Sequence, residues 1–90
     1  MIGGSITTLN IEDTQVQING GNIFEMLTNN GEININGGNI YNINMEDNNI
    51  IFINSLMTGV ITINGNDNTI YNYSGSSLNI TNNGQNNSIL

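Results

Sequence analysis

The side chains that could carry out chemistry in this chain are carboxylates, because its 90 residues include no histidine, cysteine, lysine or arginine. The seven Asp and Glu residues lie mostly in short segments rich in Asn and Gly, which are typical of turns. Adjacent carboxylate pairs at residues 12–13 and 46–47 are the remaining option for acid–base hydrolysis. Neither pair has an imidazole, thiol or amine side chain to act with, so we predict no catalytic residue and no enzymatic activity.

The same carboxylates are the candidates for a metal site. Oxygen-only ligands suit Ca²⁺, and the candidate ligands are Asp13, Asp47 and Asp67. The segment "NGNDN" at residues 64–68 resembles half of a calcium loop but lacks the distal bidentate Glu. The chain also lacks the Gly-Gly-x-Gly-x-Asp signature of calcium-binding β-rolls. We therefore interpret the carboxylates as solvated turn residues and predict no cofactor.

Charge restricts the partners of the chain. The formal net charge is −7, and no cationic side chain is present to pair with phosphate groups. We therefore expect no nucleic-acid partner and no docking on an anionic membrane surface. The longest purely apolar run covers residues 50–53, which is too short to span a bilayer. The first ten residues, "MIGGSITTLN", contain neither a basic nor an apolar region, so no signal peptide is seen.

The elements that must position these residues follow a repeat. Asn and Ile are the commonest residue types, and the pairs Gly3-Gly4, Gly20-Gly21 and Gly37-Gly38 recur at a constant spacing. We divide the single repetitive domain, residues 1–90, into ~17-residue units that would stack on one another. The units are 3–19, 20–36, a truncated unit 37–47, then 48–64, 65–82 and a partial unit 83–90. In this alignment Val16 and Ile18 correspond to Ile61 and Ile63 of the fourth unit.

Each unit contains two short arms in which apolar residues alternate with polar ones. Ile, Val, Thr and aromatic residues dominate the arms, and a period of two is typical of half-buried β-strands. Two all-β folds fit the pattern. In an antiparallel meander the five Asn-Gly dipeptides would form hairpin turns. In a β-solenoid each unit forms one coil, and equivalent residues stack into ladders of Ile and Asn. The repeat favours the solenoid, with two short strands per coil.

One outward position in the first arm is consistently apolar. It follows an inward Ile in each unit, and adjacent residues of a strand face opposite sides. We predict that these side chains form a stripe along one outer face, which is the candidate self-association interface because exposed apolar patches usually mark interfaces. In the alternative interpretation the rings are buried within the chain. The stripe consists of Phe24, Tyr41, Phe52, Tyr71 and Leu90.

These observations predict a non-enzymatic structural protein whose partner is further copies of itself, in a filament or a virion spike or tail oligomer. No Lys or Pro blunts the first or last unit, so the edge strands would be free to pair. We expect an extracellular filament or a virion component. Two alternatives remain open. A carbohydrate-binding adhesive module would use Asn, Asp and Tyr, and an ice- or surface-binding solenoid would use the outward row Gln17, Asn34, Thr62 and Asn79.

Overall fold

The structure, a computed structural model, describes residues 3–90, so residues 1–2 of the predicted domain lie outside it. The described residues form β-strands without any helix, and so they contain no helix that could cross a membrane. The strands are β1 (Ser5–Glu12), β2 (Gln15–Asn29), β3 (Glu32–Met45), β4 (Ile50–Ile53), β5 (Val60–Ile63), β6 (Thr69–Asn72), β7 (Asn79–Asn82) and β8 (Ser88–Ile89).

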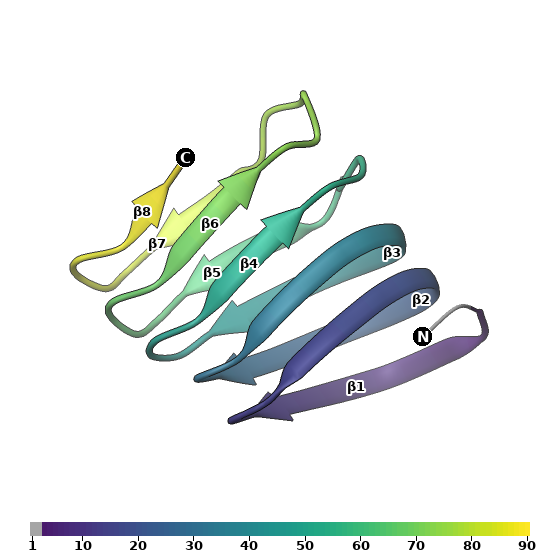
Figure 1. The fold of residues 1–90 in the computed structure, drawn as a ribbon, viewed down its shortest axis with the longest axis horizontal. Coiled ribbons are helices and arrows are strands. Elements are labelled where there is room, and N and C mark those ends of the chain that lie inside the picture. The colour runs from purple at the N-terminus through teal and green to yellow at the C-terminus, as the bar shows by residue number, and fades with distance from the viewer. Residues whose placement is uncertain (1–2) are drawn as a thin grey trace.

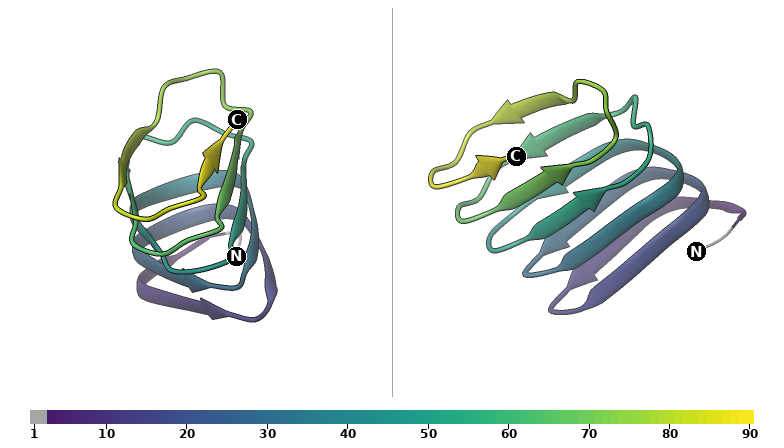
Figure 2. Two further views of the ribbon diagram at one scale, coloured as in Figure 1. Left: turned by 90° about the vertical axis from the view of Figure 1, so that its left-hand side faces the viewer. Right: turned by 45° about the horizontal axis from the view of Figure 1, so that its top comes forward.

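The strands wind into a β-solenoid of about five turns, which confirms the predicted fold (Figure 1). Each coil contributes one strand segment to each of two opposite faces (Figure 2). Face A contains residues 15–18 of β2, residues 32–35 of β3, and β4, β6 and β8. Face B contains β1, the second halves of β2 and β3, and β5 and β7. Within residues 3–90 every strand pairing is parallel, so the antiparallel meander is wrong.

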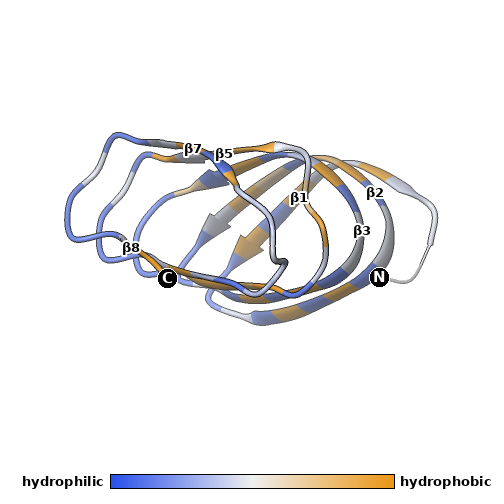
Figure 3. Ribbon diagram, turned by 90° about the horizontal axis from the view of Figure 1, so that it is seen from above, coloured by the Kyte–Doolittle hydropathy of each residue, from blue (hydrophilic) through white to orange (hydrophobic). Residues whose placement is uncertain are grey.

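Inward-pointing Ile and Met side chains from the two faces fill the space between them. Alternation along the strands sends one residue inward and the next outward, which produces the alternating apolar and polar bands of Figure 3. Burying each Ile contributes about 1.5–3 kcal/mol, so this ladder is the main source of stability. The inward residues with no exposed surface include Ile18, Ile23, Met26, Ile33, Ile43, Met45, Ile51, Ile53, Ile61, Ile63 and Ile70.

The length of a coil grows along the stack. Hydrogen bonds between equivalent Asn side chains join positions that differ by 17 in the first coils, by 18 between Asn54 and Asn36, and by 19 between Asn83 and Asn64. The added residues enter at the turn that leads from face B to face A, which we call the Asn-rich turn. Its successive copies are residues 13–14, 30–31, 46–49, 64–68 and 83–87. The coil after residue 47 is therefore lengthened, and the register contains no truncated unit 37–47.

This lengthening changes which residues are equivalent. Ile61 and Ile63 stack on Ile43 and Met45 of face B, and not on the face A segment that contains Val16 and Ile18. The two faces have the same apolar alternation, so the pattern does not distinguish a face A segment from a face B segment. Position in the pattern alone could not identify the face.

Asn and Asp residues close each Asn-rich turn in a conformation that few residue types tolerate. One residue in every copy of the turn has a φ between 53° and 63°, in the left-handed region that Asn and Asp accept more readily than other non-Gly residues. The residues are Asp13, Asn30, Asn48, Asp67 and Asn86. On the opposite side of the coil Gly21 and Gly38 have φ values of 88° and 90°. The Asn-Gly segments thus turn the chain between faces and do not form hairpins.

A buried ladder of Asn side chains supports the longer turns. The side chain of Asn49 donates to the Oδ1 atom of Asn68 at 2.9 Å, and Asn68 donates to the Oδ1 atom of Asn87 at 3.0 Å. The backbone N–H groups of Asn49 and Asn68 donate to the same oxygens. Asn68 also donates to the Glu46 carbonyl oxygen at 2.6 Å. The shorter turn at residues 30–31 has no such residue: Gly31 donates its N–H to Asn49 Oδ1, and the Thr28 hydroxyl donates to it as well.

We expect Asn68→Asp to lower the free energy of unfolding by about 3 kcal/mol, because a buried carboxylate would face two acceptor oxygens and donate to neither. The matched control is Asn19→Asp. Asn19 is exposed and its Oδ1 atom accepts from Asn36 Nδ2, a bond that a carboxylate keeps. The control should change stability by less than about 0.5 kcal/mol. Urea unfolding followed by circular dichroism measures both values, and equal effects would contradict the proposed role of the ladder.

Candidate functional site

The residues predicted to form one apolar stripe lie on two faces. Phe24 and Tyr41 are on face B, where β2 pairs with β3. Phe52 and Tyr71 are on face A, because Phe52 pairs with Asn34 and Tyr71 pairs with Phe52. Leu90 extends the face A row, since its N–H donates to the Ile70 carbonyl oxygen at 2.8 Å. The five residues therefore form two separate rows, and their role in self-association stays a prediction.

Within each row the rings stack on one another. The ring centroids of Phe24 and Tyr41 are 5.3 Å apart, with 13° between the ring planes. On face A the corresponding values for Phe52 and Tyr71 are 5.0 Å and 7°. These distances are close to the spacing of about 4.7–4.9 Å between neighbouring strands, so the stacking follows from the in-register pairing. Because each ring covers one face of its partner, stacking reduces the aromatic surface that each row exposes.

The rings lie outside the core. Phe24 is 50% exposed and Tyr41 is 47% exposed, and Phe52 and Tyr71 are half-buried. The inward neighbour Ile23 is fully buried, as expected if adjacent residues face opposite sides. These exposures disagree with the alternative interpretation, in which the rings belong to a second buried layer of the same chain.

Two exposed apolar residues on face A were not predicted. Tyr73 is 63% exposed, and its ring stacks on Tyr71 with centroids 6.1 Å apart. Ile50 is 39% exposed and stands two residues before Phe52. The sequence does contain the signal for both, because residues two apart in a strand share a face. Together with Phe52, Tyr71 and Leu90 they make the C-terminal half of face A apolar.

The outward polar row expected for an ice- or surface-binding solenoid is also divided. Gln17 and Asn34 pair with each other on face A, and the next residue in that row is Phe52. Thr62 lies on face B beside Asn44 and Thr81, and Asn79 occupies a different row beside Val60. No flat array of one polar residue type results from these four positions.

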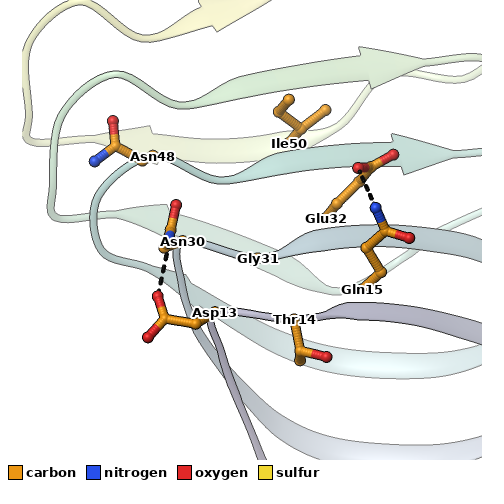
Figure 4. Close-up of a pocket in the computed structure, with 8 residues that line it drawn as sticks. All are labelled: Asp13, Thr14, Gln15, Asn30, Gly31, Glu32, Asn48 and Ile50. Carbon is orange, nitrogen blue, oxygen red and sulfur yellow. Dashed lines mark hydrogen bonds between the residues drawn. The ribbon is translucent and has the colours of Figure 1, made fainter.

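The three candidate Ca²⁺ ligands hold the Asn-rich turns together. The Oδ1 atom of Asp13 accepts from Asn30 Nδ2 at 2.7 Å (Figure 4), and Asp67 accepts from Asn86 in the same way. Asp47 uses its Oδ1 atom to accept from the backbone N–H of Asn66 at 2.8 Å. No group of three or more His, Cys, Asp or Glu residues in the described range 3–90 could hold a metal ion.

A shallow hollow beside the first turns collects several of these groups. Its two carboxylates are both hydrogen-bonded to amides, since Glu32 accepts from Gln15 Nε2 at 3.2 Å and Asp13 accepts from Asn30 (Figure 4). The hollow contains acids and amides without an imidazole, thiol or amine. The lining residues are Asp13, Thr14, Gln15, Asn30, Gly31, Glu32, Asn48 and Ile50.

The stacking keeps the carboxylates apart. In a parallel stack, identical charges in register would lie roughly 5 Å from each other, where like charges are destabilising. The structure pairs the acidic residues with uncharged ones instead. The observed neighbours are Glu12 with Asn29, Glu25 with Thr8 and Asn42, Glu32 with Gln15 and Ile50, Asp13 with Asn30, Asp47 with Asn66, and Asp67 with Asn86.

Comparison with known proteins gives no family. No protein-family model matches the chain, and no curated protein or solved structure is significantly similar to it. Function must therefore be inferred from the fold and from the exposed groups of this chain.

If the face B rings lie outside the core, their removal must cost little stability. We expect Phe24→Ser together with Tyr41→Ser to leave a folded protein and to lower the free energy of unfolding by about 1–2 kcal/mol, the value of an exposed aromatic pair. The comparison variant, Ile23→Ala, removes a core side chain and should cost about 2–5 kcal/mol. Urea unfolding monitored by circular dichroism distinguishes them. Loss of the β signal in the double variant would place the rings in the core.

Proposed function

We propose that this protein is a non-enzymatic structural protein that associates with copies of itself into a β-rich filament or a closed oligomer. The observation that carries the proposal is the pair of exposed aromatic stacks on a parallel, in-register solenoid. A regular array of ring edges spaced like the strands gives a second copy the same repeat to pack against. Such a protein would work as an extracellular filament or as part of a virion.

The edge strands support the same proposal. In the described range β1, β7 and β8 each pair with a neighbour on one side. Inward Ile89 is 46% exposed, whereas Ile70 below it in the same ladder is fully buried. Unpaired edges with an exposed continuation of the core are templates for further strands. Copies of the chain could therefore associate axially through these edge strands or laterally through the aromatic stacks.

The alternative functions gain less support. For a carbohydrate-binding module, the facing sides of the stacked rings are covered, so each stack offers only the outer faces of its end rings. Ice binding needs a regular polar array, and the outward polar row is divided between the two faces. The hollow beside the Asn-rich turns offers hydrogen-bonded carboxylates without a second catalytic group. Self-association uses the features that the solenoid repeats.

We expect assembly to increase with protein concentration and with ionic strength. All charged side chains are acidic, so salt weakens repulsion between copies by shortening the screening length from about 30 Å at 0.01 M to about 8 Å at 0.15 M. Negative-stain electron microscopy across a concentration series, paired with sedimentation velocity, measures assembly. Uniform fibres or discrete short rods would support the proposal and distinguish filament from closed oligomer. A monomer under all conditions would contradict it.

A further inference from the structure

The outward surface of face A changes character along the stack. Two outward rows run along it. In the first coils both rows contain amide or acidic side chains, and in the later coils they contain apolar, aromatic or hydroxyl side chains. The first row is Gln15, Glu32, Ile50, Thr69 and Ser88. The second row is Gln17, Asn34, Phe52, Tyr71 and Leu90. We define the C-terminal patch as the apolar residues of the second row together with Ile50 of the first row and the neighbouring Tyr73. Its members are Ile50, Phe52, Tyr71, Tyr73 and Leu90.

The C-terminal patch is exposed and carries no acidic side chain. Leu90 is 65% exposed and Tyr73 is 63% exposed. The strand segments that contain the patch, residues 50–53, 69–73 and 88–90, include no Asp or Glu. The face B stack differs in this respect, because Phe24 is followed directly by Glu25 on the same strand. Of the two aromatic stacks, only the face A stack thus lies in a segment free of charged side chains.

We propose that the C-terminal patch binds the C-terminal patch of a second copy, so that two solenoids pack face to face across a two-fold axis. This inference rests on the proposed function and names the lateral surface through which association begins. Charge favours this surface, because an all-acidic chain can pair with itself closely only where it presents no acidic side chain. A contact of the same patch on both copies is the usual arrangement in closed homodimers.

The spacing of the aromatic rings favours a second copy of this chain as the partner. The Phe52 and Tyr71 rings are 5.0 Å apart, near the strand spacing, and a second solenoid offers rings at the same interval. Ring edges from the two copies can then interdigitate, as side chains do between paired sheets.

The two-fold axis also keeps the remaining charges apart. Glu32 lies beside Ile50 on the N-terminal side of the patch. A two-fold axis that lies in the interface, parallel to face A and perpendicular to the stacking direction, makes the two stacks run in opposite directions. The Glu32 side chains then lie toward opposite ends of the dimer, and the uncharged patches meet at its centre.

The test adds one carboxylate to each of two faces. Thr69→Glu places it beside Ile50 of the C-terminal patch, in the row where Glu32 already occurs, so the fold accepts the residue type. The matched control is Asn79→Glu, at an exposed outward position of face B whose row contains Glu25. Both variants have the same net charge. We expect Thr69→Glu to raise the dimer dissociation constant at least about tenfold in sedimentation velocity, and Asn79→Glu to leave it unchanged.

A second pair of variants removes apolar groups. Tyr73→Ser with Leu90→Ser should weaken the dimer by a similar factor, and Phe24→Ser with Tyr41→Ser should leave it unchanged. Circular dichroism and urea midpoints verify that each variant is folded. Equal weakening by Thr69→Glu and Asn79→Glu would overturn the inference, because net charge and not the patch would then set the affinity. So would association lost only in the face B variant, although the proposed function would then stand. A wild-type chain that stays monomeric would overturn both proposals.

Discussion

Parallel in-register stacking is the constraint on which the rest of this structure depends. Each residue lies beside the residue one coil away, at the spacing of neighbouring strands. A side chain must therefore be compatible with its own row as well as with its two sequence neighbours. In the core Ile packs against Ile, on the outside Asn side chains donate hydrogen bonds to Asn side chains, and aromatic rings stack on aromatic rings. Carboxylates do not lie beside carboxylates, because like charges on neighbouring strands repel. The acidic residues therefore alternate with uncharged ones in their rows.

The Asn-rich turn shows how the stack tolerates variation. Lengthening the turn adds residues at the end of the coil, outside the strands, and it leaves the strands and their alternation intact. The longer turns bring a polar residue into the interior, and the ladder through Asn49 and Asn68 satisfies the amides that become buried. In the shorter turn Gly31 has no room for a side chain, because a Cβ atom would lie 2.7 Å from the Thr28 hydroxyl oxygen. Turn length and interior polarity are thus coupled.

The same constraint shapes the surface. Because outward rows run the length of the solenoid, a change of residue type along a row divides a face into zones. Face A passes from Gln and Glu to aromatic and aliphatic residues, so one half repels another acidic chain and the other half does not. A repeat built to stack coils within a chain also offers matching periodicity to another chain. The proposed self-association would in this sense extend the interactions that fold the chain, and the distribution of charge would decide which surface is available for it.

The sequence by itself determined the fold class and the inward Ile residues of the core. The constant spacing between equivalent Gly pairs and the alternation of Ile with Asn are sufficient to predict a solenoid, because stacked coils make both features necessary. Only the tertiary structure decided the face on which each aromatic residue lies. Both arms have a period of two, so the alternation does not reveal that Phe52 lies beside Asn34 on face A, while Tyr41 lies on face B. The partition of the rings into two stacks follows from hydrogen-bonded register, which exists only once the coils pack.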